Sequence, residues 1–150
     1  MGARRKGRIL AFQGLFAHEL TGTPVAELVQ LGWLDQESQE KIKQESKDFA
    51  RLLIQGTIEK LPEIDRQITQ QLEHWDFARL NKVDLAILRI SAYCLIFQTD
   101  IPPSVTIDEA IDIAKQFGTD DSYRFIMASW TAFASTGKPE GIRCPDGAGW

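Results

Sequence analysis

The stretch VDLAILRISAYCLIF, residues 83–97, is the most apolar window of the sequence. Its apolar side chains fall on every side of a helical wheel, and only Asp84, Arg89 and Ser91 interrupt it. A helix that is apolar on all sides must be surrounded by other helices. The stretch is shorter than the roughly 20 residues that cross a bilayer and longer than a buried strand of about 4–8 residues. It therefore predicts the buried central helix of a helical domain.

Helical periodicity also covers much of the remaining chain, without a strand pattern or a repeat. We expect helices over residues 4–20, 24–31, 39–60, 62–75 and 106–117, and a last helix that starts at 120–122. Thr23 is the expected cap of the second helix, with Pro24 in its first turn. Thr106 and Glu109 have the spacing of a capping box, and Gly118 suits a left-handed helix end. The predicted fold is an all-α bundle of about six or seven helices.

The composition fits one globular domain with a substantial core. The two cysteines, Cys94 and Cys144, form neither a disulfide framework nor a metal-binding spacing. No signal-peptide or membrane-spanning pattern is present, so the sequence predicts a cytoplasmic protein.

Basic residues are concentrated at the start of the chain. The net charge is −4, yet Arg4, Arg5, Lys6 and Arg8 precede the first acidic residue, Glu19. Cations in the first turns of a helix oppose its dipole, which suggests an anionic ligand such as RNA phosphate. A basic terminus that serves only solubility, or a frayed first turn, is the alternative.

A second cluster of cations and aromatic rings surrounds Gly118. It comprises Lys115, Phe117, Tyr123, Arg124 and Phe125. Rings that stack on bases, beside cations that meet phosphates, are typical of single-stranded RNA binding. The alternative is that the phenylalanines fill the core.

Residues with catalytic spacing are missing from the sequence. Neither His18 nor His74 has a metal-ligand or catalytic-base partner at a characteristic sequence spacing, and we expect His18 on the surface. Asp108 and Asp112 share a helical face, but acids suit such a position without a metal. We therefore expect no catalytic residues, no metal site and no cofactor.

Several motifs together resemble the NusB family of transcription antitermination factors. They are the basic run 4–8 followed by AFQGLF (11–16), VDLAILRI (83–90), VTIDEAI (105–111), Ala114-Lys115, Phe117-Gly118 and Phe125-Ile126. The resemblance covers about residues 3–126. It implies an all-helical fold of two small subdomains and a non-enzymatic role. That role is to bind boxA RNA together with the ribosomal protein NusE, and to join elongating RNA polymerase, notably on rRNA operons.

The resemblance also implies site residues. Arg4, Arg5 and Arg8, with Lys6 among them, match the family's arginine-rich RNA-binding motif. Asp121, Ser122, Arg124 and Phe125 match the RNA-contacting start of the last helix, and the two groups together suggest one RNA track. Phe16 and Asp84 match positions that face NusE.

The chain departs from the family pattern after Ile126. The family continues Asn-Gly-Ile-Leu-Asp, whereas this chain reads MASWTAF and ends in a tail rich in glycine and proline. One possible choice of codons for residues 126–133 also encodes the family's ending when read from the third base, so we hypothesise a one-base frameshift in the gene or its recorded sequence. Resequencing its 3′ end tests this. We expect a helical domain over 1–134 and a disordered tail over 135–150. We also expect Trp130 to be bulkier than its site.

Two other interpretations remain open at this stage. One is an accessory domain like that of rRNA cytosine methyltransferases, although the chain has no room for a catalytic domain. The other is a helical interaction module without an RNA role. The sequence is compatible with a monomer or a homodimer.

Overall fold

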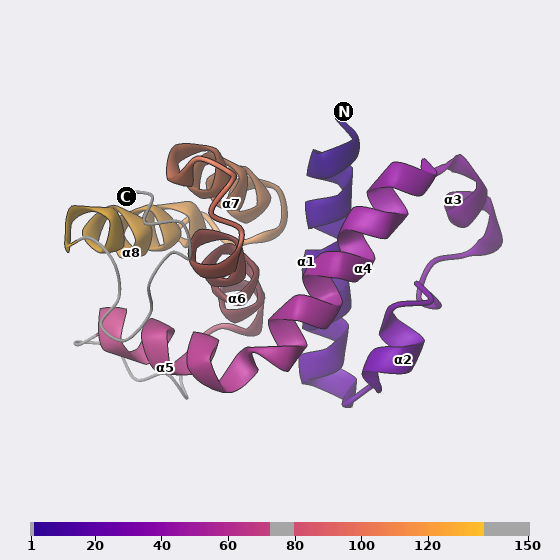
Figure 1. Ribbon diagram of the computed structural model, residues 1–150, viewed down its shortest axis with the longest axis horizontal. Coiled ribbons are helices and arrows are strands. Elements are labelled where there is room, and N and C mark those ends of the chain that lie inside the picture. The colour runs from indigo at the N-terminus through magenta and orange to yellow at the C-terminus, as the bar shows by residue number, and fades with distance from the viewer. Residues whose placement is uncertain (1, 73–79, 137–150) are drawn as a thin grey trace. The chain divides into compact units, whose positions relative to one another are not determined.

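The computed structural model describes residues 2–72 and 80–136, and side chains as far as Trp130. Within these residues the chain forms eight helices and no strand (Figure 1). They are α1 (Ala3–Thr21), α2 (Val25–Leu28), α3 (Gln36–Lys41), α4 (Gln44–Glu59), α5 (Leu61–Gln71), α6 (Lys82–Phe97), α7 (Pro103–Phe117) and α8 (Ser122–Thr136). The all-α prediction is confirmed. The chain divides into two compact units, one with α1–α4 and one with α5–α8, as the resemblance implied.

The first unit is built on the pairing of α1 with α4. Leu10 and Ala11 of α1 and Leu53 and Ile54 of α4 are completely buried. Gly7 allows the close approach of the two helices, because a Cβ there would lie 2.9 Å from the Phe49 ring and from the backbone of α4. The result is a rigid support for the basic first turns of α1.

The second unit is built around α6, which lies among α5, α7 and α8 (Figure 1). Nearly every residue of α6 from Asp84 to Ile96 is buried, which confirms the predicted central helix. Arg89 is tolerated there because Nε and Nη2 donate to the two carboxylate oxygens of Asp65 on α5, at 2.9 and 3.0 Å. Bidentate pairing satisfies a cation that burial would otherwise penalise.

The departure from the family pattern is accommodated inside this unit. Trp130 of α8 is only 2% exposed, and its indole nitrogen donates to Ser91 Oγ of α6 at 2.8 Å. The Ser91 hydroxyl in turn donates to the Ile87 carbonyl at 2.6 Å. Trp130 is therefore a hydrogen-bonded core residue of the unit. The expected tail is not tested, since α8 extends to Thr136 and residues 137–150 lie outside the described part, as does His74.

Several predicted helix ends in the first unit are wrong. Thr23 does not cap α2; Pro24 holds the cap position, and the Thr23 carbonyl lies 2.7 Å from Nδ1 of His18. His18 is therefore half-buried rather than on the surface. The predicted helix over 39–60 is two helices, because Ile42 and Lys43 adopt extended backbone angles. The Asp35 carboxylate, which accepts from the Ser38 amide at 2.7 Å, starts α3 earlier than expected.

Two predicted features of α7 are also wrong. The helix begins at Pro103, so Thr106 lies inside it as a buried residue and does not form a capping box. Gly118 is extended, with φ −89° and ψ −174°, and the left-handed glycine is Gly22, with φ 70°. Position 118 needs glycine for another reason: a Cβ there would lie 2.5 Å from the Cβ of Ser122.

Candidate RNA-binding and partner-binding surfaces

The basic residues at the start of α1 do not share one face. Arg4 and Arg8 lie one turn apart and place their guanidinium carbons 5.6 and 5.2 Å from the centre of the Phe49 ring. Both are cation–π contacts. Arg4 and Arg5 are exposed, whereas Arg8 is only 6% exposed. Arg4 and Arg5 can therefore meet phosphates directly, and Arg8 is held mainly within the fold.

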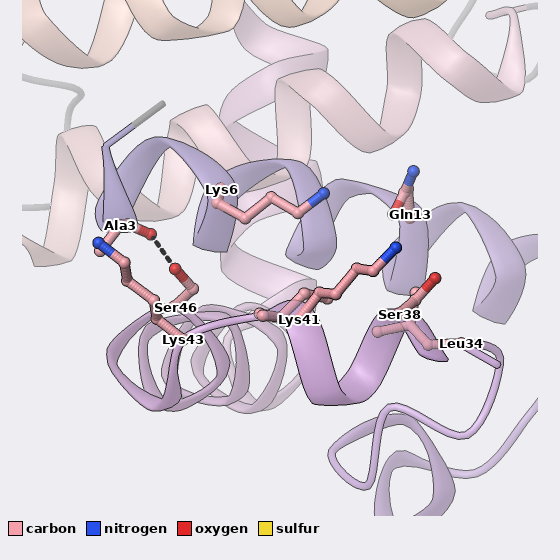
Figure 2. A pocket seen from close by; sticks show the side chains of 9 residues that line it. Ala3, Lys6, Gln13, Leu34, Ser38, Lys41, Lys43 and Ser46 are labelled. Carbon is pink, nitrogen blue, oxygen red and sulfur yellow. Dashed lines mark hydrogen bonds between the residues drawn. The ribbon is translucent and has the colours of Figure 1, made fainter. Parts of the chain in front are cut away.

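Lys6 belongs to the opposite side of α1, because successive helical residues are about 100° apart. It lines a pocket of about 510 Å³ with residues of α3 and the start of α4, among them Lys41 and Lys43 (Figure 2). The Ser46 hydroxyl donates to the Ala3 carbonyl at 2.7 Å and fixes the start of α1 at the edge of this pocket. The structure thus separates Lys6 from the arginines with which it was grouped.

The start of α8 carries exposed and buried members of the second predicted cluster. Asp121 and Arg124 are exposed and Phe125 is half-buried. Ser122 is only 1% exposed, and its hydroxyl accepts from the Thr119 amide at 3.0 Å. Ser122 therefore shapes the turn before α8, and its side chain has little surface to offer to RNA.

Tyr123 joins the cations of this cluster. Its ring centre lies 5.3 Å from the Lys115 amine and 5.5 Å from the Arg124 guanidinium carbon, and Arg124 Nε donates to its hydroxyl at 3.1 Å. The sequence grouped Tyr123 and Lys115 with Arg124 and Phe125 as a candidate RNA-binding cluster, although the family resemblance assigned neither of them to RNA. Their composition was visible in the sequence, but their contact depends on the packing of α7 against α8.

Asp84, predicted to face a partner protein, lies at the start of α6 and is 9% exposed. Burial raises the pKa of its carboxyl group, and a hydrogen bond with Ser122 partly offsets that rise. Its Oδ1 has no hydrogen-bond partner within the described residues. Asp84 therefore holds an unused acceptor at the beginning of the helix.

Phe16, the other residue predicted to face a partner, is half-buried on α1, and its ring centre lies 6.3 Å from that of Phe12. It belongs to the first unit and Asp84 to the second. A surface shared by these two residues remains a prediction. The same holds for the single RNA track, because Arg4 and Phe125 also belong to different units.

No group of three histidine, cysteine, aspartate or glutamate residues gathers as a metal site in the part of the chain that the structure describes. Over the same part, no helix is long and apolar enough to cross a membrane.

Comparison with known proteins agrees with the arrangement described. The sequence model of the NusB family matches residues 5–128. The transcription antitermination protein NusB of Treponema pallidum (strain Nichols) is 54% identical over 82% of this chain and 86% of its own length. The structure of T. maritima NusB is 40% identical, with a TM-score of 0.74 over 85% of this chain and 87% of that one. A complex of the antitermination factors NusB and NusE with dsRNA contains a chain of the same fold, at 22% identity and a TM-score of 0.76, over 88% of this chain and 96% of that one.

The class defined by the fold is therefore an all-helical protein of two units, with cation and aromatic clusters at the starts of α1 and α8. Within that class, the chain belongs to the NusB family.

Proposed function

We propose that the protein is a transcription antitermination factor that binds boxA RNA together with NusE. The observation that carries this proposal is the 54% identity to a transcription antitermination protein over most of both chains. In this role the protein joins elongating RNA polymerase in the cytoplasm, notably on rRNA operons. It acts by binding and not by catalysis.

The exposed cations supply the affinity for RNA in this proposal. Arg4 and Arg5 neutralise phosphates at the start of α1, and Arg8 orders that turn through its contact with Phe49. Phosphate contacts bind any sequence, so they do not select boxA by themselves.

The start of α8 supplies base contacts. Phe125 offers part of its ring for stacking, and Arg124 and Asp121 are exposed beside it. Ser122 contributes through the turn that it orders, because its hydroxyl is already hydrogen-bonded to Thr119. Stacked bases with hydrogen-bonded edges are how proteins read single-stranded RNA.

NusE is the proposed protein partner, as it is for the NusB chain in the complex with dsRNA. Asp84 and Phe16 are the residues assigned to this contact. Phe16 is the more accessible of the two, because Asp84 is only 9% exposed and its Oδ1 atom is buried.

A direct test compares a boxA RNA with a scrambled RNA of the same length and composition, in a fluorescence anisotropy titration of the full chain. The proposal predicts that boxA binds at least about tenfold more tightly, a difference of about 1.4 kcal/mol. Equal affinities, with and without NusE, would refute the assignment.

A further inference from the structure

A pocket on the first unit is not used by the function proposed above. It lies between α1 and the segment that joins α3 to α4, and three lysines line it: Lys6, Lys41 and Lys43. None of its lining residues is acidic. Its volume of about 510 Å³ lies in the range of small-molecule sites. A concave site with cations and no carboxylate in its lining favours an anion.

The lysine side chains are distributed along the pocket and do not meet at one point. Figure 2 shows the amines of Lys6 and Lys41 on the side of Gln13, and that of Lys43 on the side of Ala3. Gln13 and Ser38 add polar side chains to the lining. This spacing suits an extended anion with more than one charged group, such as successive phosphates.

Lys41 has a competing partner outside the pocket. Its amine lies 2.7 Å from Glu37, but both side chains are more than 70% exposed. Exposed ion pairs of this kind are weak, so a phosphate can take the place of Glu37. The break between α3 and α4 at Ile42 and Lys43 brings Lys41, the last residue of α3, and Lys43, which precedes α4, to the same cavity.

We propose that this lysine pocket binds phosphate groups, and that their source is the backbone of the bound RNA. The RNA source rests on the proposed function, whereas the phosphate chemistry does not. Lys6 is then a phosphate ligand on a side of α1 that Arg4 and Arg8 do not reach. The other source of the same chemistry is a free polyphosphate or nucleotide.

The test uses the full chain with Lys41→Ala and Lys43→Ala combined. The matched control combines Lys47→Ala and Lys60→Ala, which removes the same charge from the same unit outside the pocket. Affinity for boxA RNA is measured across salt concentrations. We expect the pocket variant to lower the slope of log K against log salt by about 1.4, since each phosphate contact on a single strand contributes about 0.7. The control should keep the wild-type slope.

A second measurement separates the two sources of phosphate. Pyrophosphate is titrated into the wild-type protein without RNA, and backbone amide shifts are followed by NMR. Shifts at Lys6, Lys41 and Lys43 in the wild type, with loss of the Lys6 shift in the pocket variant, support the phosphate site even if no RNA binds. In that case only the proposed function fails. If RNA binds, an unchanged slope with pyrophosphate shifts assigns the pocket to a free ligand and overturns the RNA source. An unchanged slope without such shifts overturns the pocket and leaves the proposed function standing; absence of both RNA binding and shifts overturns both.

Discussion

The hydroxyl of Ser122, at the start of α8, lies close enough to the carboxyl group of Asp84, at the start of α6, to lower the pKa of that carboxyl against the rise that burial causes. The same hydroxyl accepts from the Thr119 amide at 3.0 Å. The residue assigned to a partner protein and the turn assigned to RNA are thus joined by one side chain. A substitution at Asp84 should therefore alter the turn at the start of α8. This would couple the proposed NusE contact to the proposed RNA contact.

Asp84→Asn tests how much the burial of the ionised Asp84 carboxylate destabilises the fold. Burial raises the pKa of Asp84 above 3.8, so the folded state holds the proton more tightly than the unfolded chain. The protonated group contributes stability below the unfolded pKa, and that contribution is lost as the pH rises through the folded pKa. The free energy of unfolding of the variant minus that of the wild type should therefore increase from about pH 3.5 to about pH 7. Urea unfolding at both pH values measures this, and a difference that is independent of pH would contradict it.

Arg5→Ala should weaken RNA binding without destabilising the fold. The side chain is exposed, so loss of one phosphate contact should lower the salt slope by about 0.7. Arg8→Ala is the informative contrast, because Arg8 is buried against Phe49 and its loss should also lower the free energy of unfolding. Anisotropy titrations and urea unfolding of both variants check this, with Lys47→Ala as the charge control. Equal effects of the two changes on stability would show that the structural distinction is wrong.

Phe125→Leu separates a stacking ring from a core ring. Leucine keeps most of the apolar contact of this half-buried residue but has no face for a base. The variant should bind boxA RNA about 1–3 kcal/mol more weakly and unfold close to the wild-type urea concentration. Phe125→Tyr should retain the affinity. Loss of stability with no change in RNA affinity would make Phe125 a core residue.

Trp130→Ala should destabilise the second unit strongly. The side chain is 2% exposed, and cavities left by large aromatic side chains cost about 3–5 kcal/mol. Trp130→Phe keeps a six-membered ring but loses the rest of the indole and its hydrogen bond to Ser91 Oγ, so it should cost less than the alanine change. Urea unfolding distinguishes the two. Wild-type stability of the alanine variant would contradict the burial of Trp130 against α6.

The central helix could be predicted because its apolar residues leave no polar face. Burial on all sides is the only arrangement that keeps such a helix from water. The basic run at the start of α1 and the cluster of cations and rings around the start of α8 were also visible in the sequence. What these patterns could not give was the direction of each side chain. Arg8 and Ser122 are buried, while Lys6 lines a pocket whose other two lysines lie more than 30 positions away in the sequence.

The errors share a physical origin. Residues 39–47 are polar except for Ile42 and contain no glycine or proline, so nothing local revealed the break at Ile42 and Lys43. Gly118 was assigned to a positive φ, the commonest reason for glycine after a helix. Its actual reason is the approach of Ser122, which depends on how α7 and α8 meet. Trp130 was expected, from the family pattern, to be bulkier than its site. Its hydrogen bond to Ser91 could not be foreseen, because it joins two helices far apart in sequence.

The most direct test of the central claim is the dissociation constant of boxA RNA, measured with the full chain in the absence and the presence of saturating NusE. Coupling between two ligands is reciprocal. If RNA increases the affinity of the protein for NusE, then NusE must increase its affinity for RNA by the same factor. We predict a gain of at least about tenfold for boxA and a much smaller gain for a scrambled RNA. The same dissociation constant with and without NusE, and for both RNAs, would contradict the assignment of this chain as an antitermination factor.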